Sequence, residues 1–423
     1  MCSSDLRARR VRLTRGDGMD SLLRRVRGAA WLAAALALAG SAAAAQDTTK
    51  SAKFSVYGFA MLDAGTNTGQ INPDWYDVLR PTKLPAYDNE FAVNGQAFFS
   101  VRQTRFGVKS WVPTSLGELY TIFEFDMFGV GNNAGQTTIR PRQYYGQIGH
   151  VGAGQTMSAF MDLDVFPNTL EYWGPNGMIF FRNLQIRYMP IMGPTHLVIA
   201  LEAPGASADQ GVYSGRIELS GIVPKFQYPD LTANYRKAMD WGYVQLGGVV
   251  RHIAWVDTAT HAYNFSGSAT GWGLTVSSNI LIKKDAVRLQ GVYGKGIQNY
   301  MNDAPVDIGL QNNFSSSTSP VIGVPLPMWS MVAFYDHTWD EKWTSSIGFS
   351  TLVIDNSDAQ APDAFHSGSY AAANIIYYPV PNMLVGLEWV WGQRTNNSDG
   401  WKYTDNRIAI SFKYTFGKTF GGQ

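Results

Sequence analysis

The fold is decided by a stretch near the C-terminus that reads Arg407-Ile408-Ala409-Ile410-Ser411-Phe412-Lys413-Tyr414-Thr415-Phe416. Its even-numbered positions carry Ile, Ile, Phe, Tyr and Phe, whereas its odd-numbered positions carry Arg, Ala, Ser, Lys and Thr. Successive side chains of a β-strand point to opposite faces. The stretch is therefore predicted to be a strand with one apolar face and one face that tolerates water.

The same alternation recurs between residues 53 and 416, in roughly fifteen or sixteen segments of about a dozen residues. No apolar run after the N-terminal region reaches the length of about 20 residues that a membrane-spanning helix needs. An open sheet edge in lipid would leave unpaired N–H and C=O groups, so the strands must close on themselves. The sequence thus predicts an all-β fold, a transmembrane antiparallel β-barrel of about 16 strands.

The N-terminus has the features of a bacterial export signal. A basic region at Arg24, Arg25 and Arg27 precedes an apolar run over residues 29–40, which is too short to span a bilayer. Residues 43–45, Ala-Ala-Ala, provide an A-x-A cleavage site. Residues 1–45 are therefore predicted to be a signal peptide, with Met19 as a candidate initiator, and residues 46–423 a single β-barrel domain.

Composition argues against several classes of function. Without the 8 Arg and 3 Asp of residues 1–45, the formal net charge moves from +1 to −4, which does not suit a nucleic-acid binder. The only cysteine, Cys2, lies in the leader, so neither disulfides nor thiolate metal sites are expected. The six histidines lack metal-ligand spacing, and there is no Gly-x-Ser-x-Gly motif. No catalytic residue, metal site or cofactor is predicted.

Turn signals divide the connections into two classes. Short turns, flanked by Trp and Tyr, are predicted at residues 111–117, 237–241, 283–285, 339–343 and 379–382. Aromatic rings favour the membrane–water boundary, so these turns are assigned to the periplasmic end. Long segments, expected to face outside, cover residues 66–95, 157–177, 296–328 and 355–368. The alternative is a soluble sandwich whose hairpin aromatics pack on each other.

Basic residues recur on the faces predicted to point inward. The proposed pore-lining, anion-binding set is Arg105, Lys109, Arg140, Arg142, Arg187, Arg236, Arg251 and Arg288. Guanidinium groups hold carboxylates through two hydrogen bonds, and a ladder of them lowers the barrier for an anion. The alternative is that each arginine pairs with an acidic neighbour and only stiffens the wall.

A long segment of mixed polarity at residues 154–177 follows a short strand. If it folds inward it narrows the pore, and its constriction residues are then Asp162, Asp164, Glu171, Tyr172 and Trp173. The three carboxylates would face the basic wall and create a transverse field. The alternative is an outward loop that packs on a neighbouring subunit.

With the strands placed, the chain resembles the DcaP-like trimeric outer-membrane porins. The matching segments cover residues 54–63, 100–109, 140–146, 154–162, 181–188 and 229–236. The resemblance implies a homotrimer of sixteen-stranded barrels with an inward-folded third loop, through which small anions such as dicarboxylates and aromatic acids diffuse. Two departures are present. Only residues 46–52 precede the first strand, so the N-terminal coiled coil of some members is not expected. Phe416, the expected terminal aromatic, is followed by seven further residues.

The leading hypothesis is a passive porin of the bacterial outer membrane that passes small hydrophilic solutes and prefers anions. Its expected partners are small anionic solutes, outer-membrane lipid and lipopolysaccharide, and two further copies of the chain. The alternatives are a general, weakly selective porin and an outer-membrane barrel enzyme or adhesin. An enzyme should place a histidine beside Ser or Asp near the outer rim, and an adhesin should have patterned loops; the sequence has neither.

Overall fold

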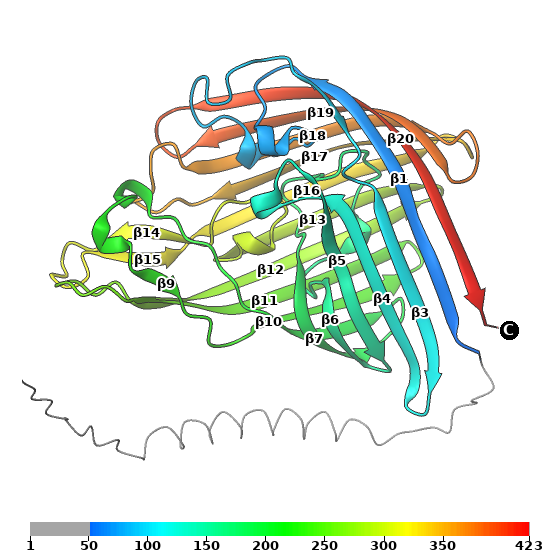
Figure 1. Cartoon of the computed structure of the whole chain (residues 1–423), viewed down its shortest axis with the longest axis horizontal. Helices are drawn as coiled ribbons and strands as arrows, with labels where there is room; N and C mark the ends of the chain where they lie inside the picture. Colours follow the sequence, from blue (N-terminus) through cyan, green and yellow to red (C-terminus); the bar gives the residue numbers. More distant parts are fainter. Residues whose placement is uncertain (1–50, 423) are drawn as a thin grey trace, which may run out of the picture.

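A computed structural model describes residues 51–422, so the predicted signal peptide lies outside the described residues. Sixteen antiparallel strands form one closed barrel (Figure 1). They are β1 (Lys53–Asn67), β3 (Arg105–Thr114), β4 (Gly117–Phe128), β5 (Thr137–Ile148), β6 (Val151–Met157), β7 (Arg182–Ile191), β8 (His196–Glu202), β10 (Asp230–Met239), β11 (Gly242–Asp257), β12 (Gly267–Ile282), β13 (Asp285–Lys295), β16 (Pro327–Thr338), β17 (Trp343–Ile354), β18 (Phe365–Tyr377), β19 (Met383–Asn396) and β20 (Lys402–Gly421). The predicted fold class and strand number are confirmed.

The barrel closes between its first and last strands. β1 pairs with β20 from Lys53↔Gly421 to Asn67↔Arg407 without interruption. Tyr414 of β20 is 61% exposed on the outside, whereas Arg407 is only 1% exposed. The alternation that predicted this strand therefore separates its outer and inner faces. The residues after Phe416 continue the same strand to Gly421.

Four further strands lie at the loop-bearing end. β2 (Ala97–Ser100) pairs with β1 beyond the end of β3, and β9 (Ile222–Pro224) pairs with β11 beyond the end of β10. At two positions of the barrel wall, the strand is thus divided into two segments. β14 (Ile308–Asn312) and β15 (Val321–Pro325) form a separate hairpin. The 3₁₀ turns are η1 (Pro73–Trp75), η2 (Pro81–Lys83), η3 (Gly131–Asn133), η4 (Leu163–Val165), η5 (Gly211–Tyr213), η6 (Ile217–Leu219) and η7 (Gln298–Tyr300).

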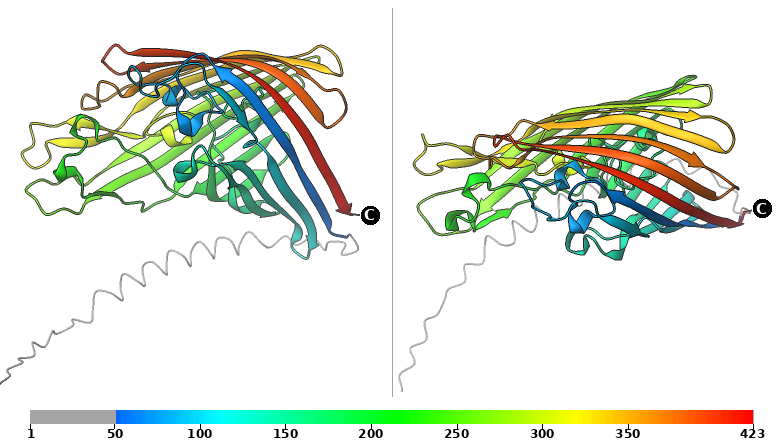
Figure 2. Two further views of the ribbon diagram at one scale, coloured as in Figure 1. Left: turned by 45° about the horizontal axis from the view of Figure 1, so that its top comes forward. Right: turned by 90° about the horizontal axis from the view of Figure 1, so that it is seen from above.

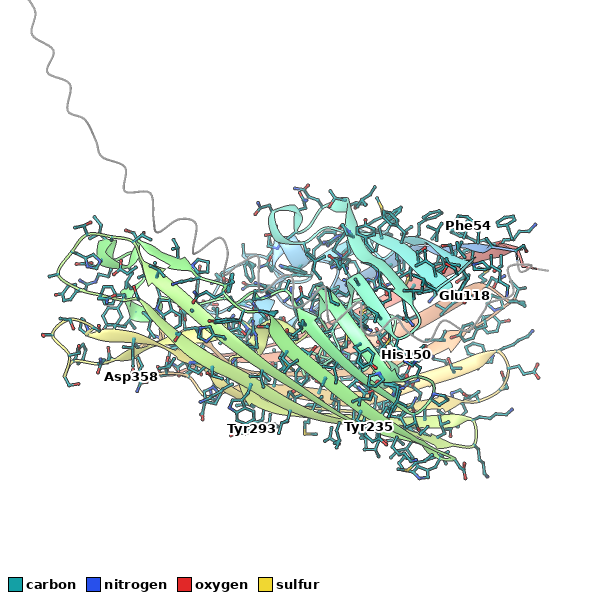
Figure 3. The ribbon with its side chains drawn as sticks, turned by 90° about the horizontal axis from the view of Figure 1, so that it is seen from below. Phe54, Glu118, His150, Tyr235, Tyr293 and Asp358 are labelled. Atoms are coloured by element: carbon teal, nitrogen blue, oxygen red, sulfur yellow. The ribbon has the colours of Figure 1, made fainter. Side chains whose placement is uncertain are left out.

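The two ends of the barrel differ as the turn signals predicted. All five predicted short turns join neighbouring strands, and they lie at the end where β1 begins and β20 finishes (Figures 1 and 2). Figure 3 places Glu118 and His150 toward this end and Asp358 at the opposite, loop-bearing end. Within residues 51–422, no helix has the length and apolarity to cross a membrane.

The apolar core is built inside the barrel by loops that fold inward. Phe160 and Ile179 of the loop between β6 and β7 pack with Ile297 and Tyr300 of the loop between β13 and β14. All four are fully buried. The long segments thus leave the barrel at the end opposite the short turns, but these stretches turn back into the lumen, which the sequence predicted for the third loop only. Water-facing wall positions alone could not bury so much apolar surface, and the loops supply it.

Candidate functional site

The third long loop, residues 158–181 between β6 and β7, lies across the lumen. Asp162 accepts hydrogen bonds from Arg236 at 2.6 Å, Tyr243 at 2.9 Å and Ser277 at 2.6 Å, which belong to β10, β11 and β12. Farther along the loop, the backbone amides of residues 170 and 171 donate to a carboxylate of β19 at 2.8 and 2.7 Å. The loop is therefore tied to opposite parts of the wall, and the predicted inward fold is confirmed.

The tip of this loop reaches the wall formed by β4 and β5. The Tyr172 hydroxyl contacts Arg142 at 2.6 Å and also hydrogen-bonds to Asp126 and Arg140. Its ring stacks on Phe128 with centroids 4.4 Å apart. Asp126 is buried and accepts hydrogen bonds from both arginines, so one phenol is held by two cations and one anion. This network fixes the position of the loop tip in the lumen.

Trp173 continues the contact toward two other loops. Its indole N–H donates to the Asn302 carbonyl at 2.8 Å. The Arg80 guanidinium lies 4.2 Å from the Trp173 ring and 4.1 Å from the Trp75 ring, and its terminal amine lies 2.8 Å from Asp303. Stacking of guanidinium on indole is favourable. The loop between β1 and β3, the third loop and the loop between β13 and β14 are thus joined at one point above the lumen.

The Glu171 carboxylate contacts the first long loop, between β1 and β3, rather than the basic residues of the wall. Its carboxylate accepts hydrogen bonds from the Leu79 amide at 2.5 Å, the Gly174 amide at 2.8 Å and the Tyr370 hydroxyl at 3.2 Å. Burial raises the pKa of Glu171 to about 7, and the charge of Glu388 adds to this effect. Its role is to anchor the loop.

Five of the eight predicted basic residues have carboxylate partners. Arg142 lies 2.8 Å from Glu124 and 2.7 Å from Asp126. The remaining pairs are Arg140 with Asp126 at 2.7 Å, Arg236 with Asp162 at 2.6 Å and also with Asp164, Arg251 with Asp230 at 2.9 Å and Asp307 at 2.8 Å, and Arg288 with Asp336 at 2.5 Å. These five match the alternative in which arginines stiffen the wall.

The other three predicted cations, Arg105, Lys109 and Arg187, have no carboxylate within 4 Å among residues 51–422. They lie beside aromatic rings instead. Arg105 is 5.2 Å from the Phe59 ring, Lys109 is 4.7 Å from Tyr57, and Arg187 is 5.5 Å from Tyr145. None of the three is therefore held in an ion pair, although Glu124 lies near enough to act on the charge of Arg105, and Glu202 on that of Arg187.

Two more cations share this property. Lys413, on the inner face of β20, lies 5.2 Å from the Phe59 ring, opposite Arg105 in the same cluster. Arg182 lies 5.1 Å from Phe180 and is close enough to Arg140 and Arg142 to interact with their charges. The set of eight pore-lining residues predicted from the sequence includes neither of them.

The omission of Arg182 follows from a wrong strand start. Alternation of apolar and polar residues in the sequence predicts a strand over residues 180–188, with Phe180 on the lipid-facing side. In the structure β7 begins at Arg182, and Phe180 belongs to the third loop, where its amide donates to the Tyr300 carbonyl at 3.0 Å and its ring packs on the interior core. The apolar residues of an inward-folded loop lie inside the barrel, whereas the alternation of a strand assigns apolar residues to the lipid-facing side.

Metal chemistry finds no support in the described part of the chain. Between residues 51 and 422, no group of three or more His, Cys, Asp or Glu side chains could hold a metal ion. The arrangement is instead a lumen wall with several cations that have no carboxylate partner, with the Asp162 and Glu171 carboxylates held by other residues. Such a wall acts on a passing ion through its field.

The model of the DcaP outer membrane protein family matches residues 32–416. The chain belongs to this family. It is an outer-membrane β-barrel of the channel-forming kind. Its fold is similar to the crystal structure of the outer membrane channel DcaP of Acinetobacter baumannii, with a TM-score of 0.72, 20% identity, and coverage of 86% of this chain and 97% of that chain.

Two other solved barrels are more distant. The anion-selective porin from Comamonas acidovorans has a TM-score of 0.56 at 8% identity and covers 86% of this chain and 100% of that chain. An OmpT loop L8 deletion mutant from Vibrio cholerae has a TM-score of 0.52 at 11% identity and covers 88% and 100%. At these identities the likeness shows the fold alone. No curated protein sequence matches the chain.

Proposed function

We propose that this DcaP family member is a passive outer-membrane porin that passes small hydrophilic solutes and prefers anions, without catalysing a reaction. The observation that carries the proposal is the imbalance of charge in the lumen. Five cations, Arg105, Lys109, Arg182, Arg187 and Lys413, have no carboxylate within 4 Å among residues 51–422, whereas Asp162 and Glu171 of the third loop are held by hydrogen bonds. An entering anion therefore meets positive charge that is not held in ion pairs.

The same residues support a preference for carboxylates over simple inorganic anions. A guanidinium fork matches the two oxygens of a carboxylate, and a lysine ammonium acts as a second, compact charge. Arg105 and Lys413 lie on either side of Phe59, at 5.2 Å each, so two cations share one aromatic ring. Dicarboxylates and aromatic acids combine the features that such a cluster attracts, and they are the proposed solutes.

Assembly as a homotrimer, surrounded by outer-membrane lipid and lipopolysaccharide, completes the proposal. It rests on membership of the family and on the apolar outer face of the strands, exemplified by Tyr414, Phe412 and Ile410 of β20, each more than a third exposed. Lipid or a neighbouring barrel must cover such a face. The Comamonas acidovorans porin of similar fold is described as anion-selective, which agrees with the proposed preference.

Single-channel recording in a planar bilayer with a salt gradient tests the selectivity. The wild type is expected to give an anion-selective reversal potential and conductance in groups of three. The double variant Arg105→Gln/Arg187→Gln should lower the anion-to-cation permeability ratio about threefold or more, because both charges act without a local counter-ion. A matched control, Lys237→Gln/Lys418→Gln, removes the same charge from exposed positions on the outer face of β10 and β20 and should leave the ratio unchanged.

A general, weakly selective porin is the second candidate, and the pairing of five predicted arginines favours it. In that case the wild-type reversal potential lies near zero and Arg105→Gln/Arg187→Gln does not move it. A cation-selective reversal potential of the wild type would overturn the proposed anion preference but not the proposal that the protein is a channel. Folded, heat-modifiable protein without conductance would favour the enzyme or adhesin readings over a porin.

A further inference from the structure

A pocket of about 300 Å³ lies at the loop-bearing end, and none of the eight predicted pore-lining residues lines it. It is enclosed by residues 206–210 of the fourth long loop, β9, the end of β11 and the β14–β15 hairpin, which Figure 1 shows together at the end opposite the C-terminus. Val223 and Phe226, 43% and 40% exposed, lie at its rim. The rim of the pocket is thus open to solvent, and its lining contains none of the unpaired cations on which the proposed anion preference rests.

The lining of the pocket is almost entirely apolar. Its floor includes Leu219, Ile253, Ile308 and Val321, each less than a tenth exposed, and these residues come from four separate segments of the chain. A cavity lined by Leu, Ile and Phe side chains stays free of ordered water and binds apolar rings. The lining therefore favours an uncharged, apolar guest.

The few polar groups of the lining are already satisfied. Ser207 donates to Asn299 at 2.8 Å. Asp209 accepts from the Gly211 amide at 2.7 Å and from Gln360 at 3.2 Å. The side-chain amide of Gln210 donates to the Leu219 carbonyl at 3.3 Å. A charged or strongly polar guest would find no free partner here, and burial of an unpaired charge is costly.

One wall of the pocket is a fixed aromatic ring. The Trp255 indole N–H donates to the Phe265 carbonyl at 2.7 Å. Two glycines lie against the same edge of the ring: a Cβ at Gly323 would stand 2.6 Å from its Cζ2 atom, and a Cβ at Gly267 would stand 2.8 Å from that atom. Only glycine at these two positions leaves room for the indole. A ring fixed at its edge and through its N–H is a preformed apolar surface, and a preformed surface lowers the cost of binding.

We propose that this pocket is a binding site for an uncharged ring-sized apolar group at the extracellular mouth of the barrel. A cavity of about 150 Å³ lined by Leu, Ile and Phe is enough to bind benzene. The volume here is twice that benchmark, so one ring with an alkyl arm, or two fused rings, fits. The chemistry is that of a free aromatic hydrocarbon-like solute or of an acyl chain from the outer leaflet.

Toluene serves as the probe, and a fluorine label reports its binding. The chain's only cysteine, Cys2, is in the predicted leader, so Val223→Cys creates a single attachment point for a trifluoromethyl tag at the rim. The tag's fluorine-19 NMR shift should move saturably as toluene is added to protein in lipid-free amphipol, with a Kd of about 1 mM or tighter. The matched control is the same tag at Ala262→Cys in the neighbouring loop, which does not line the pocket and should show no saturable shift.

Two further comparisons decide the ligand class and its source. Benzoate, which has the same ring with a charge, should bind at least about tenfold more weakly, because its carboxylate would be buried unpaired. In nanodiscs whose outer leaflet contains lipopolysaccharide, retained toluene binding assigns the pocket to a free solute. Loss of binding only in those discs assigns it to an acyl chain.

The remaining test fills the pocket with a larger side chain. Ala208→Phe, in a protein shown to be folded by heat-modifiability, should abolish the saturable shift, and Ala206→Leu is a smaller second variant with the same purpose. Absence of a saturable shift in the unblocked protein in amphipol, equal binding of benzoate, or full binding in both blocked variants would overturn the proposal. None of these readouts depends on ion current, so the outcome is independent of anion preference.

Discussion

Two parts of the lumen wall carry similar numbers of basic residues but use them differently. On β10, β11 and β13, Arg236, Arg251 and Arg288 each contact carboxylates, partly from loops that fold against them. On β20, β3 and the lower part of β7, Lys413, Arg105 and Arg187 contact aromatic rings or neutral oxygens. The two sets are called the paired wall and the open wall, according to whether their cations have carboxylate partners.

The difference shows that the neighbours of a lumen arginine, rather than the residue type, decide what it does. A guanidinium paired with buried carboxylates stabilises the fold, because its removal leaves those charges buried and unpaired. A guanidinium without a carboxylate partner is the kind proposed to attract a solute. Substitutions on the two walls should therefore affect different properties.

The largest expected effect is on stability, at the paired wall. Arg251 is 1% exposed at its side chain and contacts Asp230 and Asp307. Arg251→Gln should reduce the free energy of unfolding by about 3–5 kcal/mol, because it leaves two buried carboxylates without their cation. Arg187→Gln, on the open wall, should cost only about 1 kcal/mol. Denaturant titration of the protein in lipid vesicles, followed by heat-modifiability, measures both.

A compensating variant sharpens this test. Arg251→Gln combined with Asp307→Asn removes one of the stranded charges and should recover part of the lost stability. Equal destabilisation by Arg251→Gln and Arg187→Gln would remove the distinction between the two walls. So would a double variant that is less stable than Arg251→Gln alone.

The sequence was sufficient for the barrel but not for these pairings. Alternation in β20 and the short turns predicted strand faces, strand number and closure, because a strand's period of two is a local property. The pairing of Asp162 with Arg236 depends on where a flexible connection of two dozen residues folds, which no local period encodes. The same limit explains why Phe180 was placed on the lipid face and why Arg182 was missed.

The second prediction concerns the pH dependence of the loop anchor. The ordinary pKa of glutamate is 4.5 and that of Glu171 is raised to about 7, mainly by burial. A raised folded-state pKa means that the stabilisation is full below about pH 4.5 and is lost as pH rises through about 7, by at most about 3 kcal/mol. The third loop should therefore be held less firmly at pH 8 than at pH 5, and open-channel current noise should increase over that range.

Glu171→Gln is the control for this effect, because an uncharged amide cannot titrate. Its noise should resemble that of the wild type at pH 5 and should not change with pH. If the pH dependence persists in Glu171→Gln, another group is responsible. Glu388 would be the next residue to replace, because its carboxylate accepts a hydrogen bond from the backbone amide of residue 171 at 2.7 Å.

The smallest expected effect comes from the hydroxyl that joins the third loop to the wall of β4 and β5. Tyr172→Phe keeps the stack on Phe128 but removes the hydrogen bonds to Asp126 and Arg142. Asp126 retains both arginines, so unfolding should change by only about 1 kcal/mol. The loop tip, however, loses its directional contact with the wall, and single-channel current should become noisier at unchanged ion selectivity, since no charge is altered. A clear fall in anion preference in this variant would mean that the loop position itself, and not the unpaired cations of the open wall, sets selectivity.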